Sequence, residues 1–352
     1  MKAIFVETPG DAQSLTIENF PTPKPSATEL LVRVKATALN RADILQRMGK
    51  YPPPKGVSPI LGLEMAGIVE EVGSAVSGWR EGDQVCGLLP GGGYAEYVTI
   101  PAKMAMPIPE ALSFEEAAAI PEVFLTAYQA LYWLGDLKSG QNVLVHAGAS
   151  GVGTAAIQLI KEAGANAIVT SGSAKKLDFC LKLGAKAAIN YKDGEFAKHT
   201  MEATNNEGVD IILDFVGASY MAQNLASLAV DGRLVLLATM GGSQVNQFNL
   251  MTLLRKRLQI IGTTLRARSL DYKIHLTNDF VKNILQDFDE GKYKPIIDSI
   301  YSWKQVADAH QRMEANLNMG KIILRIDPLT EEKEDVENKR SERIIISLND
   351  DR

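Results

Sequence analysis

Apolar runs alternate with helical stretches between about residue 121 and residue 265. Residues 174–183 and 219–229, for example, have a helical pattern. Short continuous apolar runs are typical of buried parallel strands, and their alternation with helices is typical of a doubly wound sheet. The pattern therefore predicts an α/β region with six parallel strands. These strands are expected to open at Val143, Ala167, Ala187, Val209, Leu234 and Leu258.

Residues 1 to about 120 follow a different pattern. Short strand-like runs, such as residues 30–36, are separated by turns rich in glycine and proline. This spacing is typical of a compact barrel-like β domain. A mixed pattern follows residue 266, with helices predicted over residues 280–288 and 306–315 and a last strand over residues 321–326.

Three segments follow from these patterns. We expect one domain from residues 1–120 together with 266–328, and a second domain from residues 121–265. The last segment, residues 329–352, carries eight acidic and five basic side chains, which is typical of a poorly ordered tail. It contributes −3 of the net charge of −5, so the folded body is close to neutral.

Composition narrows the class of protein. A chain of 352 residues with 46% hydrophobic and 22% charged residues is an ordinary globular protein of two-domain size. The negative net charge argues against nucleic acid as the main partner. Two cysteines are too few for a disulfide framework or a four-thiolate zinc lobe. With no signal-peptide pattern and no apolar run of membrane-spanning length, we expect a cytoplasmic protein without membrane association.

A glycine-rich turn joins the strand at 143–145 to the next helix. Such a turn lets the pyrophosphate of a dinucleotide approach backbone N–H groups at a helix N-terminus. The alternative is a tight strand–helix turn with no ligand, but strand, turn and helix all agree here, which favours cofactor binding. A serine holds the position of the second glycine in the usual motif. The predicted contacts are Gly148, Ser150, Gly151, Val152 and Gly153.

The segment after the second strand favours NADPH over NADH. Sites for NAD place an Asp or Glu there to bind the ribose 2′-hydroxyl, yet no acid precedes Asp178. Hydroxyl and ammonium groups suit a 2′-phosphate instead, although lysines here could simply be solvated. The predicted contacts are Gly172, Ser173, Lys175 and Lys176.

Several short sequence motifs resemble those of the medium-chain dehydrogenase/reductase superfamily, in its zinc-free quinone oxidoreductase branch. Within that branch, the resemblance is closest to the quinone oxidoreductases that a tumour suppressor induces in mammals. It covers residues 1 to about 327 and implies a GroES-like β-barrel catalytic domain joined to a Rossmann NADPH-binding domain. The motifs lie at residues 38–43, 61–64, 88–93, 117–122, 148–153, 313–316 and 320–321.

The same resemblance bears on whether this chain binds zinc. Zinc alcohol dehydrogenases carry a Cys where this chain has Asn40 and a His where it has Leu63. Asn is a poor zinc ligand and Leu is none, so we expect no zinc. The neighbouring Glu64 is then expected to have a structural role.

The resemblance also implies the remaining site residues. Asn40 and Tyr51 are the catalytic candidates; Asn40 is also a candidate cofactor contact, or simply a helix cap, and Tyr51 could merely pack among its prolines. Tyr191 is expected at the phosphate end of the cofactor and Asn316 at the nicotinamide end. Further cofactor contacts are expected at strand ends, where Arg266 could also just face solvent: Phe215, Val216, Met240, Gly241, Thr264, Leu265 and Arg266.

These expectations lead to an NADPH-dependent quinone reductase that works without metal. A quinone is electron-poor and needs little polarisation, so a positioned nicotinamide and an apolar slot suffice. The alternatives are a 2-alkenal or enoyl reductase, and a non-catalytic NADPH-binding protein like the lens crystallins of this fold. The apolar sixth strand, residues 258–264, is last in the sheet, which predicts a homodimer that joins two such edges.

Overall fold

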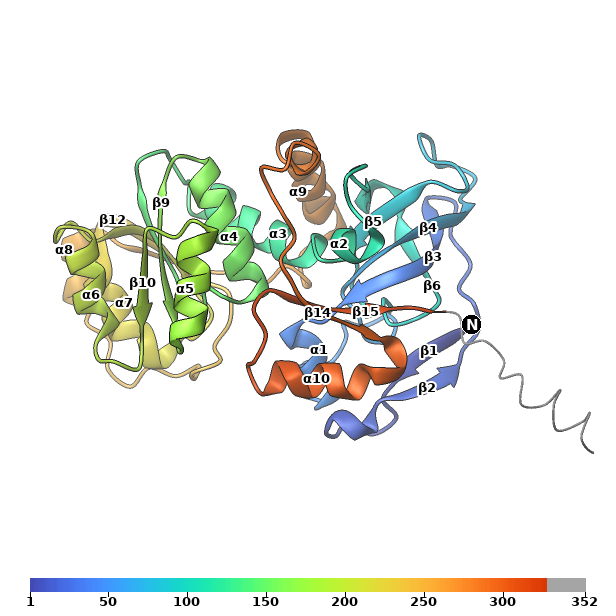
Figure 1. Cartoon of the computed structure of the whole chain (residues 1–352), viewed down its shortest axis with the longest axis horizontal. Coiled ribbons are helices and arrows are strands. Elements are labelled where there is room, and N and C mark those ends of the chain that lie inside the picture. The colour runs from blue at the N-terminus through green and yellow to red at the C-terminus, as the bar shows by residue number, and fades with distance from the viewer. Residues whose placement is uncertain (328–352) are drawn as a thin grey trace, which may run out of the picture.

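The structure is a computed structural model that describes residues 1–327. Its two main sheets lie side by side, and helices pack between and around them (Figure 1). The predicted tail, residues 329–352, lies outside the described residues.

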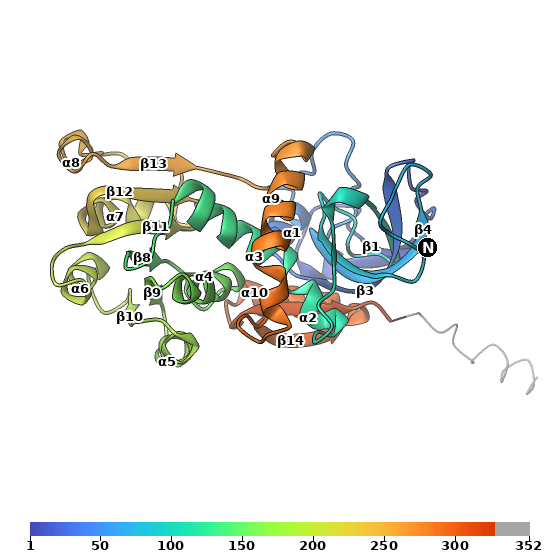
Figure 2. The ribbon, with the colours of Figure 1, turned by 90° about the horizontal axis from the view of Figure 1, so that it is seen from above.

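The first sheet has six parallel strands in the order β10-β9-β8-β11-β12-β13, which can be followed across Figure 2. This order reverses direction at β8, so the predicted doubly wound fold is confirmed. The strands are β8 Asn142–Val145, β9 Asn166–Ser171, β10 Ala187–Asn190, β11 Val209–Asp214, β12 Leu228–Leu236 and β13 Gln259–Gly262. The helices associated with it are α4 Gly151–Glu162, α5 Ala174–Leu183, α6 Phe196–Ala203, α7 Met221–Ser227 and α8 Leu250–Lys256.

Both faces of this sheet are buried, which explains the continuous apolar runs. Val143 and Val145 belong to the main core of the molecule, whereas Leu144 between them belongs to a second core on the opposite face. Side chains of a strand alternate between the two faces, so a run without polar interruptions serves both cores.

The second sheet is built around the long strand β3, which pairs with β4, β6 and β15. Register shifts in the β3–β4 pair are the bulges that bend such a sheet. Strand β15 comes from the far end of the chain, so the two separated halves of the predicted first domain share one sheet. The strands are β3 Glu29–Ala38, β4 Glu64–Val72, β5 Gln84–Leu88, β6 Tyr97–Pro101, β7 Ala105–Pro107, β14 Ile297–Ser302 and β15 Lys321–Arg325, with β1 Lys2–Phe5 and β2 Thr16–Asn19 in a small separate sheet.

Aromatic packing fills the space between the two sheets. Phe124 on α3 (Pro121–Tyr128) is fully buried and contacts the rings of Phe280, Phe288 and Tyr293. The helix that carries Phe280 differs from the prediction: α9 spans Leu270–Asn283, and a separate 3-10 turn covers Leu285–Phe288. It starts early because the Ser269 hydroxyl accepts a hydrogen bond from the Tyr272 N–H, a cap within a mainly polar stretch.

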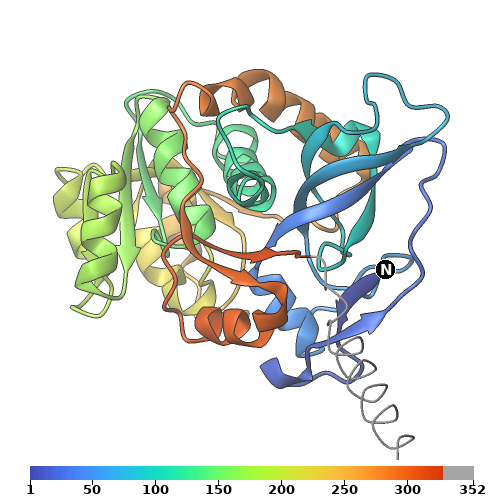
Figure 3. The same cartoon turned by 45° about the vertical axis from the view of Figure 1, so that its right-hand side comes forward.

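The remaining α-helices of the described residues are α1 Arg41–Arg47, α2 Phe114–Ala118 and α10 Val306–Glu314, and a π-helix, Gln129–Leu134, follows α3 directly. Helix α10 follows β14 and packs against α1 and β15 (Figure 3). Among residues 1–327, none of the helices combines the length and the apolar character needed to cross a bilayer.

Strand β13 forms one edge of the six-stranded sheet, where only β12 pairs with it among the described strands (Figure 2). Ile260 on this strand is exposed, and so are Leu250 and Leu254 on α8. An unpaired edge beside exposed apolar side chains is suited to pairing with another copy of the chain. Dimerisation through this edge stays a prediction.

We expect light scattering at micromolar concentration to give the molar mass of a dimer. Replacing Leu254 by Glu together with Ile260 by Lys places charges on the exposed edge and should give a folded monomer. Leu181→Glu, an exposed leucine on α5, is the matched control and should leave the mass unchanged. A monomeric wild-type protein, or a double variant that stays dimeric, would contradict the edge pairing.

Candidate active site

The glycine-rich turn follows β8 and opens α4, as predicted. The Ser150 hydroxyl caps the helix by accepting a hydrogen bond from the Gly153 N–H at 3.1 Å. The N–H groups of Gly151 and Val152 lie in the first turn, where a helix offers them no acceptor of its own. Both residues are only half-buried, so these donors are available to an anion.

The turn has no room for a side chain at three of its positions. A Cβ atom on Gly148 would lie 2.6 Å from the Val169 side chain, and one on Gly153 would lie 2.5 Å from the Ala147 carbonyl oxygen. At Gly151, a Cβ atom would lie 2.8 Å from the Lys321 side chain. The missing side chains thus let the backbone pack close to the neighbouring elements, and with the unpaired N–H groups of the first turn of α4 the turn fits a dinucleotide pyrophosphate.

The residues predicted at the 2′-phosphate are partly brought together. The Tyr191 ring is half exposed and packs over Gly172, where a Cβ atom would lie 2.5 Å from the tyrosine oxygen. Ser173 is exposed at the start of α5, and its hydroxyl makes no capping bond. Lys175 is exposed, whereas Lys176 is half-buried, which distinguishes the two lysines.

Asn316, predicted at the nicotinamide end, lies beside Lys176, a residue predicted at the 2′-phosphate. The Lys176 ammonium donates to the Asn316 carbonyl oxygen at 2.6 Å, and the Arg41 guanidinium donates to the Asn316 side-chain oxygen at 2.7 Å. Asn316 adopts a positive φ of 54°, which turns the chain after α10 towards α5. Burial lowers the pKa of Lys176, with positive Arg41 and Arg312 acting in the same direction.

The ends of β11 and β12 meet, as predicted for strand ends beside a cofactor. The Gly241 N–H donates to the Val216 carbonyl oxygen at 2.7 Å, and the Met240 N–H donates to that of Phe215 at 3.1 Å. The buried Asp214 carboxylate fixes this turn by accepting a hydrogen bond from the Val216 N–H at 2.6 Å. After β13, Thr264 is exposed while Leu265 is buried, so the two predicted contacts differ in access.

A buried lysine connects the turn to the catalytic candidate Asn40. The Lys321 ammonium lies 2.7 Å from the Glu64 carboxylate and donates to the Asn40 side-chain oxygen at 2.8 Å and to the Leu39 carbonyl oxygen at 2.7 Å. The aliphatic part of Lys321 passes beside Gly151. This contact places Asn40 within one side chain of the pyrophosphate turn.

Asn40 stands at the N-cap position of α1, but its side chain does not cap the helix. Its amide nitrogen donates to Glu64 at 2.8 Å, so both ends of the amide are held by the Glu64–Lys321 pair. The Glu64 carboxylate also accepts from the Glu122 N–H at 2.8 Å. The expected structural role of Glu64 fits these contacts, because it is fully buried and holds β4, α1, α3 and β15 together.

A second buried chain of polar groups supports Asn40 from behind. Asp43 accepts a hydrogen bond from the Asn40 N–H at 2.8 Å and from the Tyr94 hydroxyl at 3.3 Å. The Tyr94 hydroxyl also lies 3.3 Å from His310, whose other ring nitrogen faces Arg47 at 3.2 Å. Burial and the Arg47 charge lower the pKa of His310 to about 3, so its ring is neutral near pH 7.

Tyr51, the other catalytic candidate, stands over Arg266. The guanidinium carbon lies 5.2 Å from the centre of the Tyr51 ring, so Arg266 does not face solvent. Burial raises the pKa of the Tyr51 phenol, which keeps its proton near neutral pH. Burial and the Glu64 charge raise the pKa of the nearby Glu122 carboxyl to about 8.

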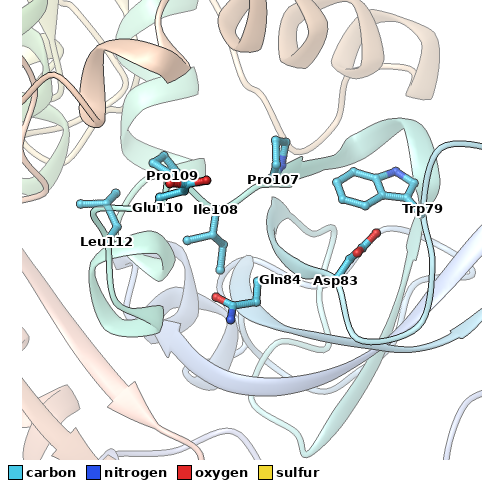
Figure 4. Close-up of a pocket in the computed structure, with 8 residues that line it drawn as sticks. All are labelled: Trp79, Asp83, Gln84, Pro107, Ile108, Pro109, Glu110 and Leu112. Carbon is cyan, nitrogen blue, oxygen red and sulfur yellow. The ribbon is translucent and has the colours of Figure 1, made fainter.

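At the two positions where zinc enzymes of this superfamily carry metal ligands, this chain has side chains that contact other groups of the protein. Leu63 is buried in the core, and the Asn40 amide is bonded to Glu64 and Lys321. Among residues 1–327, no three His, Cys, Asp or Glu side chains cluster as metal ligands would. A separate pocket on the second sheet (Figure 4) contains none of the predicted site residues; it is lined by Trp79, Asp83, Gln84, Pro107, Ile108, Pro109, Glu110 and Leu112.

Three important residues were not singled out by their sequence pattern. Lys321, Glu122 and Arg47 become significant only through contacts with distant parts of the chain. For Lys321 and Glu122 a signal exists, since both stand in motifs that carry the family resemblance. For Arg47 the sequence pattern contains no such signal, because a charged residue in a short helix is expected to face solvent. Its side chain is nevertheless fully buried.

We predict that Lys321→Met lowers the free energy of unfolding by about 3–5 kcal/mol, because it leaves the Glu64 carboxylate buried without its partner. Denaturant unfolding followed by circular dichroism measures the change. The matched control is Lys182→Met, which breaks the exposed ion pair with Asp178 and should cost less than about 1 kcal/mol. An equal loss of unfolding free energy in the two variants would show that the buried ion pair stabilises the protein no more than the exposed one.

Comparison with known proteins extends these observations. The family model described as alcohol dehydrogenase GroES-like domain matches residues 26–110, and the one described as zinc-binding dehydrogenase matches residues 151–299. The synaptic vesicle membrane protein VAT-1 homolog of Mus musculus is 34% identical over 86% of this chain and 77% of its own length. The quinone oxidoreductase of Rattus norvegicus is 29% identical over 92% of this chain and 97% of its own.

Solved structures agree with this likeness. The mycobacterial protein Rv1454c, complexed with NADPH, has a TM-score of 0.82 and 30% identity, and the match covers 93% of this chain and 100% of that one. The CurK enoyl reductase also has a TM-score of 0.82, with 28% identity over 93% and 99% of the two chains. The two matched domain models, the sequence identity and the shared fold all agree, and the chain belongs to the medium-chain dehydrogenase/reductase superfamily.

Proposed function

We propose that this oxidoreductase is an NADPH-dependent quinone reductase that needs no metal. The observation that carries the proposal is the site around Lys321, which joins a dinucleotide-binding turn to Asn40 and Glu64 where zinc enzymes of the superfamily hold their metal. The Lys321 ammonium binds the side-chain oxygens of both Asn40 and Glu64, so these oxygens are not free to bind a metal. A similar protein is named quinone oxidoreductase, and another was solved with NADPH, which supports the choice of acceptor and cofactor.

When bound, the nicotinamide cofactor supplies a hydride, so that NADPH becomes NADP⁺ and a quinone gains two electrons and one proton. The chain itself binds and orients the reactants. The first turn of α4 would hold the pyrophosphate, and Lys176 and Ser173 would hold the 2′-phosphate. The Tyr51 phenol, which keeps its proton at neutral pH, would supply the second proton that yields the hydroquinone. We propose the cytoplasm as the place of action.

The second candidate is an NADPH-dependent 2-alkenal or enoyl reductase, because the CurK enoyl reductase shares the fold. The third is a protein that binds NADPH without catalysis. In each case the cofactor side would be the same, and only the acceptor side would differ.

Turnover of 1,2-naphthoquinone and of a 2-alkenal, measured side by side by NADPH oxidation, separates these candidates. We expect quinone turnover to exceed alkenal turnover and to persist in chelator, because the residues at the metal position are Asn40 and Leu63. Faster turnover of the alkenal would favour the second candidate. NADPH binding without turnover of either acceptor would favour the third, and activity lost in chelator and restored by zinc would refute the metal-free mechanism.

The cofactor preference can be tested at Ser173. Two charge-assisted contacts to a 2′-phosphate would favour NADPH over NADH by roughly a hundredfold or more. Ser173→Asp places a carboxylate where none stands now and should weaken NADPH binding with little effect on NADH, as measured by nicotinamide fluorescence. Thr204→Val, whose hydroxyl bonds within α6 and the turn after it, is a control away from the cofactor. Equal affinity for both cofactors in the wild-type protein would contradict this interpretation.

A further inference from the structure

Arg266 has a buried donor without an acceptor. Its Nε donates to the Pro90 carbonyl oxygen at 2.8 Å, and its Nη2 donates to the Gln46 side-chain oxygen at 2.9 Å. The third nitrogen, Nη1, is shielded from solvent and has no hydrogen-bond partner among the described residues. The side chain as a whole is only 9% exposed. Buried donors are almost always paired, so this guanidinium nitrogen has an unused N–H to offer to a ligand oxygen.

The charge of this guanidinium is only partly balanced. Two carboxyl groups interact with it, those of Asp43 and Glu122, and the raised pKa of Glu122, about 8, leaves that carboxyl largely protonated near pH 7. Lys273 adds a second positive charge in the same region, where it interacts with both Arg266 and Glu122. The Tyr51 ring lies against the guanidinium, 5.2 Å from its central carbon to the ring centre. These groups together favour a negatively charged or strongly accepting oxygen atom.

We propose that Nη1 of Arg266 binds the carbonyl oxygen of the acceptor and stabilises the negative charge that reduction places on it. The proposal rests on the proposed reductase function and deepens it. Hydride addition to a conjugated carbonyl compound moves an electron pair onto this oxygen, which stays anionic until a proton from Tyr51 or water joins it. A fixed N–H donor in a site closed to water stabilises such a charge strongly. Since the Tyr51 ring lies against the guanidinium, binding of the acceptor there requires this ring to shift.

This assignment defines the acceptor class. The substrate must carry an oxygen conjugated to the carbon atom that accepts the hydride, as in quinones, enals and enones. It also moves Arg266 from the predicted cofactor contacts to the acceptor side, where Gln46 and the Pro90 carbonyl group act as positioning groups. An alkene without a conjugated oxygen has no acceptor for the guanidinium N–H, so we expect it to be a poor substrate.

The test uses 4-nitrophenolate, an inert aromatic ring whose oxygen stands in for the anionic oxygen of the reduced acceptor. Its neutral isostere, 4-nitrotoluene, measures apolar binding alone. Calorimetry in the presence of NADP⁺, at a pH where the probe is ionised, should show that the wild-type protein prefers the phenolate. Arg266→Met should lower phenolate affinity on the order of tenfold to a hundredfold and leave 4-nitrotoluene and NADPH affinity unchanged. Should this variant not fold, Arg266→Gln keeps an N–H donor for Pro90 without the charge.

Arg268→Met is the matched control, because this nearby guanidinium also lies over a tyrosine ring, 4.6 Å from the centre of Tyr272, and has its own partner in Thr263. The control should bind the phenolate like the wild-type protein. A wild-type protein without phenolate preference, or an Arg266 variant that keeps the preference, overturns the assignment. A parallel loss of NADPH affinity would also overturn it and return Arg266 to the cofactor. If the phenolate binds through Arg266 but no quinone or enal is reduced, the proposed function fails and the anion site stands.

Discussion

The ion pair between Lys321 and Glu64 is the constraint on which the site depends. Both groups are almost completely buried, so neither charge is solvated by water, and each depends on the other and on the surrounding hydrogen bonds. Lys321 belongs to the last described strand and Glu64 to the start of β4, 257 residues earlier in the chain. The same carboxylate holds Asn40 and the start of α3, so one salt bridge fixes the catalytic candidate, the domain junction and the support behind the glycine turn.

Local pattern predicted the parts of the fold that depend on local physics. The run Val143–Val145 had to be a doubly buried strand, and the glycine turn followed from the need for close backbone approach at Gly148 and Gly153. The start of α9 was missed because its cap, Ser269, stands before a mainly polar stretch. The partners of Lys321, Arg47 and Arg266 lie far away in sequence, and neither periodicity nor composition records such pairs. The fold brings some of the site residues proposed from resemblance into contact, such as Asn316 with Lys176, and their roles stay predictions.

The two sides of the proposed site differ in the kind of group that forms them. On the cofactor side, backbone groups and a helix N-terminus would perform the recognition, and these features recur among proteins of this fold with different activities. On the proposed acceptor side, side chains would perform it: Tyr51, Glu122, Arg266 and Lys273 come from separate segments and interact through ring contact and charge rather than through a shared motif. Similar proteins named as quinone oxidoreductase, enoyl reductase and synaptic vesicle protein are therefore compatible with one scaffold.

The bridge between Ser150 and Gly320 has a consequence for how the protein matures. The Gly320 N–H donates to the Ala149 carbonyl oxygen at 2.9 Å, and the next residue supplies the ammonium group that Glu64 and Asn40 need. During synthesis the first sheet strands and the glycine turn leave the ribosome long before β15 does. Contacts of such large sequence separation form late and carry a high loop-closure cost. In a chain under synthesis, the Glu64 carboxylate therefore lacks its Lys321 partner until the last described strand pairs with β3.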